Sequence, residues 1–94
     1  MYIIDLTYKK KLSEVDHHIE AHKLFLKKYY TTKNFICSGR KNPRNGGIII
    51  ASFTSLDDVN KAIEEDPFFT NDIANYSITE FIPSKYDKDI LSIN

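Results

Sequence analysis

Two residues that can exchange protons stand where a small domain is expected to be apolar. His22 lies on the apolar stripe of a predicted amphipathic helix, whose other members are Val15, Ile19, Leu26 and Tyr29. Asp66 precedes Pro67 at the predicted end of a second helix, because a residue before proline is disfavoured in helical conformation. A carboxylate bonded to one ring nitrogen would fix the tautomer of His22 and stabilise its imidazolium, which suits acid–base catalysis. The spacing alone favours a structural role over a catalytic one. In that role His22 is a core histidine whose hydrogen-bond partner is a helix-capping aspartate.

The elements that would position these residues follow from hydrophobic periodicity. Alternating apolar residues predict strands at residues 2–8, 35–39, 47–53 and 76–82. One helix is predicted over residues 13–30 with Ser13 as its N-cap, and another begins at the N-cap Ser55 and is terminated by Pro67. Residues 1–94 are expected to form a single domain, of which residues 84–94 are a polar C-terminal tail.

The order of these elements is typical of an α+β fold. Strand, helix, strand, strand, helix and strand give the ferredoxin-like βαββαβ arrangement, a four-stranded antiparallel sheet with both helices on one face. Residues 48–51 are apolar on both faces of their strand, so the open face of the sheet is also expected to be covered. A second copy of the sheet is the economical cover, and we expect a homodimer packed sheet to sheet.

Composition and charge exclude several classes of partner. The chain has 13 basic and 13 acidic residues without long runs of either sign, so no binding to nucleic acid or to an anionic membrane is predicted. The first apolar stretch is too short for a signal peptide and no segment reaches bilayer length, so we expect a cytoplasmic protein. The single cysteine, Cys37, excludes an intramolecular disulfide and is expected to be a small core residue.

Three other functions find little support in the residues. RNA-recognition domains share the βαββαβ order, but residues 47–51 lack the aromatic side chains that stack on bases. His18 and His22 lie on one helix face, yet no third metal ligand is evident, so no metal site is predicted. Cys37 has no adjacent base and no serine lies in a nucleophile elbow, which argues against nucleophilic catalysis.

The loop after the second strand carries three cations near two glycines. Arg40, Lys41 and Arg44 could hold an anionic or phenolate oxygen, because cations and free backbone N–H groups suit one. The alternative is a solvated hairpin tip, which we prefer for Lys41 and weigh equally for Arg44. Phe68, in preference to Phe69, could form a wall of a substrate pocket, although such aromatic residues usually belong to the core.

Six segments form a recognisable pattern: the strand at Tyr2 and residues 21–26 (AHKLFL), 38–39 (SG), 43–49 (PRNGGII), 65–68 (EDPF) and 80–86 (EFIPSKY). Together they resemble the YciI-like (YCII-related) family of small dimeric α/β-barrel proteins. The resemblance covers nearly the whole chain, and the order and spacing of its motifs are more specific than any one of them. Arg40 stands where many members carry proline, which leaves the shape and charge preference of the pocket open.

The resemblance implies a homodimeric, cofactor-free enzyme whose active site is a His-Asp pair, at His22 and Asp66 in this sequence. The leading hypothesis is therefore proton transfer on a small organic molecule, by elimination, isomerisation or hydrolysis. The residues predicted to line the substrate pocket are Ser38, Gly39, Arg44 and Phe68. The alternative is a non-catalytic dimeric module that binds a small molecule or a partner protein, in which the pair is structural.

Overall fold

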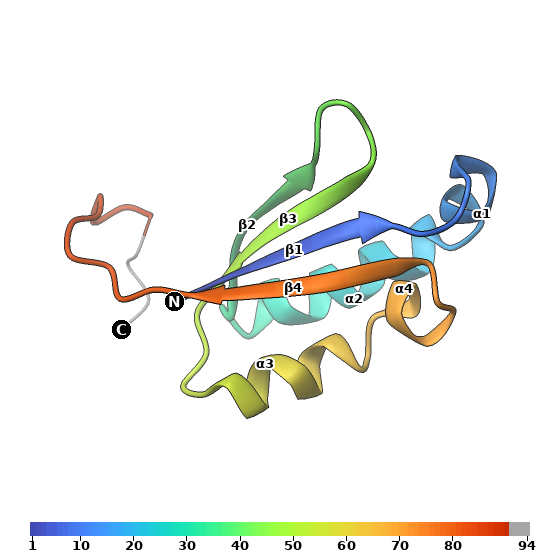
Figure 1. Cartoon of the computed structure of the whole chain (residues 1–94). Coiled ribbons are helices and arrows are strands. Elements are labelled where there is room, and N and C mark those ends of the chain that lie inside the picture. Colours follow the sequence, from blue (N-terminus) through green and yellow to red (C-terminus); the bar gives the residue numbers. More distant parts are fainter. Residues whose placement is uncertain (91–94) are drawn as a thin grey trace.

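Four antiparallel strands form a single sheet in the computed structural model, which describes residues 1–90. Their order across the sheet is β2-β3-β1-β4. The elements are β1 (Tyr2–Tyr8), α1 (Leu12–His17), α2 (Ile19–Thr31), β2 (Phe35–Arg40), β3 (Gly46–Ala51), α3 (Leu56–Ile63), α4 (Pro67–Thr70) and β4 (Ala74–Glu80). The helices α2, α3 and α4 lie on one side of the sheet and leave the other side open (Figure 1). The predicted ferredoxin-like βαββαβ fold is confirmed.

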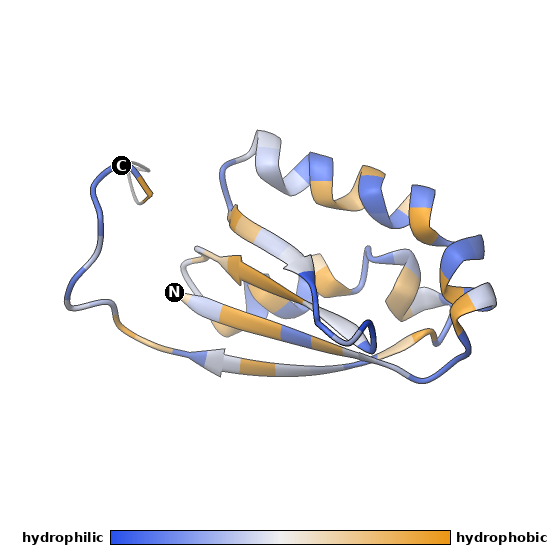
Figure 2. Ribbon diagram, turned by 90° about the horizontal axis from the view of Figure 1, so that it is seen from above, coloured by the Kyte–Doolittle hydropathy of each residue, from blue (hydrophilic) through white to orange (hydrophobic). Residues whose placement is uncertain are grey.

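The helix-facing side of the sheet carries the core. In β1, Tyr2, Ile4 and Leu6 are buried while the residues between them are more accessible, as the period of two requires. Figure 2 shows apolar residues recurring along the central strands and, at helical spacing, along the facing helices. The core consists of Tyr2, Ile4, Leu6, Val15, Phe25, Phe35, Ile49, Ala51, Val59, Ile63, Phe68, Ile73 and Ala74.

The first predicted helix is interrupted in the structure. α1 ends at His17 and α2 begins at Ile19, because His18 has φ −108° and ψ 4°, outside the helical region. The predicted N-cap at Ser13 is wrong, since the N-cap of α1 is Lys11 and makes no side-chain capping hydrogen bond. Neither glycine nor proline marks the break, so the pattern of residue types gave no signal for it.

The second predicted helix is also divided. Ser55 caps α3 as predicted, and its Oγ accepts a hydrogen bond from the backbone N–H of Asp58 at 3.2 Å. The helix ends at Ile63, and Pro67 begins α4 instead of terminating α3. Proline suits this first helical position because its missing N–H has no partner there and its fixed φ is already helical. Asp66 is therefore the N-cap of α4, and not the exit of the preceding helix.

The boundaries of three strands and one burial expectation are corrected by the structure. β2 continues to Arg40, β3 begins at Gly46 and ends at Ala51, and β4 spans Ala74–Glu80, so each of these five strand ends differs from the prediction by one or two residues. Cys37 is exposed, and the expectation of a small core residue is wrong. Its register opposite Ile50 places it on the open face of the sheet, away from the helices.

The open face of the sheet carries apolar residues. β1 and β3 place Ile3 and Ile50 opposite each other on this face, where both are partly exposed.

In the described part of the chain, no helix is long and apolar enough to cross a membrane. Beyond Pro83 the described tail contains only turns and bends, and residues 91–94 of the predicted tail lie outside the described residues.

Candidate active site

His22 and Asp66 lie within hydrogen-bonding distance at the centre of the domain. Nδ1 of His22 is 2.8 Å from Oδ1 of Asp66, so the middle of α2 contacts the start of α4 across 44 residues of sequence. Asp66 is 0% exposed and His22 is 9% exposed. A buried ion-forming pair of this kind is stable only when the remaining lone pairs and protons also find partners.

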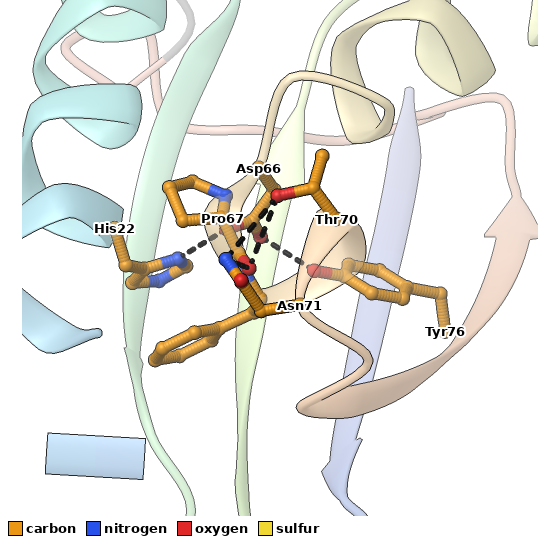
Figure 3. A network of polar contacts seen from close by, with 7 residues as sticks. His22, Asp66, Pro67, Thr70, Asn71 and Tyr76 are labelled. Carbon is orange, nitrogen blue, oxygen red and sulfur yellow. Dashed lines mark hydrogen bonds and ion pairs between the residues drawn. The ribbon is translucent and has the colours of Figure 1, made fainter. Parts of the chain in front are cut away.

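Both oxygens of the Asp66 carboxylate accept further hydrogen bonds. The backbone N–H of Phe68 donates to Oδ1 at 2.9 Å, which is the helix cap of α4. The hydroxyl of Tyr76, on β4, donates to Oδ2 at 2.6 Å. Figure 3 shows His22 and Tyr76 approaching Asp66 from opposite sides. The carboxylate is thus held by α2, α4 and β4 together, and its orientation toward the imidazole is fixed.

The Tyr76 phenol is a permanent donor in this network. Burial raises its pKa well above the ordinary value, and the neighbouring negative charge and hydrogen bond of Asp66 raise it further. Tyr76 therefore stays protonated at neutral pH and supplies one of the partners that a buried carboxylate needs.

The hydrogen bonds around Asp66 define which imidazole nitrogen is available for chemistry. A carboxylate can only accept, so Nδ1 of His22 is the donor toward Asp66. Among residues 1–90, Nε2 makes no hydrogen bond. It is therefore the nitrogen that can take a proton from a ligand or give one back, while Asp66 stabilises the imidazolium that forms.

Phe68 fixes the plane of the imidazole. Its ring stacks on His22 with centroids 4.1 Å apart and an angle of 5° between the planes. Phe68 is fully buried, and Tyr8 packs edge-on against its ring with centroids 5.9 Å apart. The imidazole is thus constrained by a hydrogen bond at one edge and by an aromatic face, which limits its rotation.

A cavity of about 240 Å³ lies beside His22, between α2 and the sheet. Apolar residues form most of its wall, and the polar groups gather on α2 and on β2. Its lining residues are Leu6, Tyr8, Ile19, His22, Lys23, Leu26, Ser38, Gly39, Arg40, Gly47, Ile48, Ile49 and Phe68. A mostly apolar cavity with a few converging polar groups and a paired histidine is the arrangement expected of a small-molecule site.

The family relationship is decided by a sequence comparison. Residues 1–82 match the model of the YCII-related domain. The chain belongs to the YCII-related family. No curated protein matches the chain in a separate comparison.

The fold of this YCII-related domain also recurs among solved structures. It superimposes with a TM-score of 0.73 on a 5-chloro-2-hydroxyhydroquinone dehydrochlorinase (TftG) from Burkholderia phenoliruptrix AC1100, in a complex with 2,5-dihydroxybenzoquinone. The superposition covers 95% of this chain and 98% of that chain, at 17% sequence identity. The two proteins therefore share the fold over almost their whole length.

The structure brings most of the predicted site residues of this YCII-related domain together. His22, Ser38, Gly39 and Phe68 line the cavity, and Asp66 lies behind His22. Ser38 shares a hydrogen bond with the hydroxyl of Tyr30 at 2.7 Å, which joins β2 to α2 at the edge of the site. Arg44 is not part of the lining, because its guanidinium forms an ion pair with Asp16 on α1.

Among the polar residues of the site, Tyr8, Lys23 and Tyr76 were not predicted as site residues, and Arg40 was considered only as one of three cations that could hold an anion. Tyr76 pairs with Leu6 across the sheet and so shares its helix-facing side, a signal that strand alternation alone could have given. For Arg40 the signal was weaker, since the predicted strand ended one residue before it. Lys23 and Tyr8 enter the site through three-dimensional packing that has no local sequence signature.

Among the described residues, no group of three or more histidine, cysteine, aspartate or glutamate side chains lies close enough to hold a metal ion.

Proposed function

We propose that this YCII-related domain is a cofactor-independent enzyme that transfers a proton on a small organic molecule, by elimination, isomerisation or hydrolysis. The observation that carries the proposal is the 2.8 Å contact between His22 and Asp66 beside a cavity that His22 lines. His22 moves the proton, and Asp66 orients the imidazole and stabilises its charged form. Ser38, Gly39 and Phe68 are the proposed substrate contacts.

Each protein group has a defined part in this proton transfer. Nε2 takes the proton from the substrate, and the imidazolium remains bound to Asp66 through Nδ1–H. The positive charge forms next to a carboxylate that is already oriented by Phe68 N–H and by Tyr76, so little reorganisation is required during the reaction. The reverse transfer, from the imidazolium back to the product or its leaving group, completes the cycle.

The similar fold of TftG supports the elimination variant of this proposal. That protein is a dehydrochlorinase, and removal of hydrogen chloride requires a base to accept the proton. The 2,5-dihydroxybenzoquinone in that complex is a single-ring molecule. A compound of that size is compatible with a cavity of about 240 Å³.

The role proposed for Arg44 differs from that of the lining residues. Its ion pair with Asp16 joins the β2–β3 loop to α1. Arg44 would thus position the loop that precedes β3, and any contact with substrate would require it to leave Asp16.

The functional unit is proposed to be a homodimer that packs through the open sheet face. Ile3 and Ile50 lie side by side on that face, and Ile48 follows on the same side of β3 opposite Asp5. An apolar stripe on a sheet that no helix covers is stabilised when another surface removes it from water.

A non-catalytic binding module is the second candidate. It is favoured by the hydrogen bond from Phe68 N–H to Asp66, because a helix-capping aspartate that also satisfies a histidine would serve stability without any reaction.

Turnover by the His22→Gln variant separates the two candidates. A panel of phenolic, halogenated and lactone compounds, together with 2,5-dihydroxybenzoquinone, is incubated with the protein and product formation is measured. For any compound turned over, His22→Gln is expected to lower kcat at least about 100-fold and to change ligand affinity by less than about tenfold. The matched control is His17→Gln on α1, whose side chain is exposed and outside the cavity. Equal turnover by both variants, or no turnover of any compound by the wild type, would favour the binding module.

A further inference from the structure

The three cations at the end of β2 and in the loop after it, Arg40, Lys41 and Arg44, differ in their surroundings. Lys41 forms an ion pair with Asp5 at 2.5 Å, and Arg44 pairs with Asp16. Arg40 forms no ion pair among residues 1–90, and it alone of the three lines the cavity beside His22. Its charge is therefore available to a ligand there.

The register of β2 explains why Arg40 reaches the cavity. Arg40 lies opposite Gly47, and Ser38 lies opposite the buried Ile49, so both belong to the side of the sheet that faces α2. The hydrogen bond between Ser38 and Tyr30 on α2 independently places that side of β2 against the helix. Gly47 has no side chain that could fill the space beside Arg40.

The charges that line the cavity are of one sign. Its ionisable lining residues, apart from His22 and Tyr8, are Lys23 and Arg40, and no aspartate or glutamate belongs to the lining. Lys23 has a carboxylate partner on its own helix, Glu20, at 3.1 Å, and both side chains are largely exposed. Such an exposed pair is weak and leaves most of the lysine charge available. An anion in the cavity would meet two cations and no opposing carboxylate.

Most of the remaining cavity lining is apolar. The aliphatic lining residues are Leu6, Ile19, Leu26, Ile48 and Ile49, and Phe68 is aromatic. The cavity volume of about 240 Å³ lies below the roughly 300–1,000 Å³ that is typical of drug-sized ligands. It suits a single-ring or similarly small body with one polar end.

We propose that this site selects small organic anions, with an oxyanion on the guanidinium of Arg40 and an apolar body against Phe68 and the aliphatic wall. This proposal names the substrate class for the proposed proton transfer. The reaction of the bound anion rests on that proposed function, whereas binding of the anion does not. Arginine suits the role because its planar fork pairs with both oxygens of a carboxylate and keeps its charge at any physiological pH. The polar end would be held at β2, while the body extends toward His22.

Matched acid and amide pairs test this selection. The probes are benzoate with benzamide, salicylate with salicylamide, and cyclohexanecarboxylate with its amide, titrated into the full chain at low salt and followed by NMR chemical shifts. Each acid is expected to bind more tightly than its amide. Arg40→Gln is expected to weaken binding of the acids about tenfold and to leave the amides unchanged within about threefold. Arg40→Lys should fall between, because it keeps the charge and loses the fork.

Two further variants make the outcome specific. Lys61→Gln removes one positive charge from the exposed face of α3, outside the cavity, and should leave acid binding unchanged. His22→Gln should keep the Arg40-dependent preference for acids even where turnover is lost. The inference is overturned if acids and amides bind alike, if no probe binds, or if Lys61→Gln weakens the acids as much as Arg40→Gln. If the wild type catalyses no proton transfer but still binds the acids in an Arg40-dependent way, only the proposed function is overturned.

Discussion

The Asp66 carboxylate receives three donors, and each comes from a different part of the chain. His22 Nδ1 and Phe68 N–H share Oδ1, and Tyr76 donates to Oδ2. Removing any one of these donors leaves the fully buried carboxylate of Asp66 with fewer hydrogen bonds to offset the cost of its burial. The stability of the fold and the proposed chemical function of the site are therefore coupled through a single residue, Asp66.

Replacing Tyr76 by phenylalanine tests this coupling. Tyr76→Phe removes the donor to Oδ2 and is expected to lower the free energy of unfolding by about 1–3 kcal/mol, the usual cost of a buried acceptor without its partner. Because Tyr76 contacts Asp66 and not the cavity, it is a positioning residue, and kcat should fall more than KM changes. Urea denaturation and steady-state kinetics measure the two effects. Tyr86→Phe, at an exposed tyrosine, is the matched control, and equal stability of the two variants would contradict this role for Tyr76.

At the residue scale, the sequence indicated His22 and Asp66 more readily than the residues that support them. His22 stood out because a titratable side chain occupied an apolar stripe, and its need for a polar neighbour followed from the cost of burial. Tyr76 gave no such signal, since a tyrosine in a strand usually packs as an aromatic residue. The identity of the second donor to Asp66 depends on how β4 lies against α4, which no local pattern of residues encodes.

At the scale of elements, a second polar network joins α2 to the segment between α3 and α4. Lys28 and Tyr29 of α2 both donate to the carboxylate of Glu65, which directly precedes Asp66. The hydrogen bond from Lys28 is the main reason that the pKa of Glu65 lies below its ordinary value, and the hydrogen bond from Tyr29 is the second. Burial, followed by the hydrogen bond to Glu65, raises the pKa of Tyr29 to about 12. This network fixes the approach of the Asp66 segment to the helix that carries His22.

The lowered pKa of Glu65 makes a signed prediction about stability and pH. A carboxylate whose pKa is lower in the folded state stabilises the fold above its unfolded value, near 4.5, and this contribution is lost as the pH falls through the folded value. The wild type is thus expected to exceed Glu65→Gln in unfolding free energy at about pH 6, by less than about 1 kcal/mol because the pair is exposed. The difference should shrink at about pH 3.5. Urea titrations at the two pH values measure it, and a difference that grows on acidification would contradict the network.

The element order was predictable from periodicity, whereas two helix boundaries were not. Alternation identified all four strands within two residues, and the capping signal at Ser55 located the start of α3. The break at His18 lies in the backbone angles of that residue, and no glycine or proline in the sequence indicates it. The start of α4 was missed for a different reason, because an Asp-Pro pair serves equally well to end one helix or to begin another.

At the scale of the whole molecule, the open sheet face is expected to be an interface between two copies. Light scattering at micromolar concentration should give twice the chain mass of 10.9 kDa. Ile50→Lys places a charge in the apolar stripe and should convert the protein to a single chain, because an unpaired charge is costly to bury in an interface. Leu24→Lys, at an exposed position on α2, is the matched control and should remain dimeric. A wild-type mass of one chain would contradict the dimer.

The family match covers residues 1–82, and the fold shared with TftG covers 95% of the chain. In the proposed function, His22 transfers a proton between a bound carbon acid and water. Deuterium incorporation from D₂O into the exchangeable C–H groups of 2,5-dihydroxybenzoquinone and of the phenolic panel, followed by NMR, tests this transfer without requiring a complete reaction. We expect at least one compound to exchange at least about 100-fold faster with the wild type than with His22→Gln, while His17→Gln matches the wild type. Exchange at the same rate with the wild type and His22→Gln for every compound would contradict it.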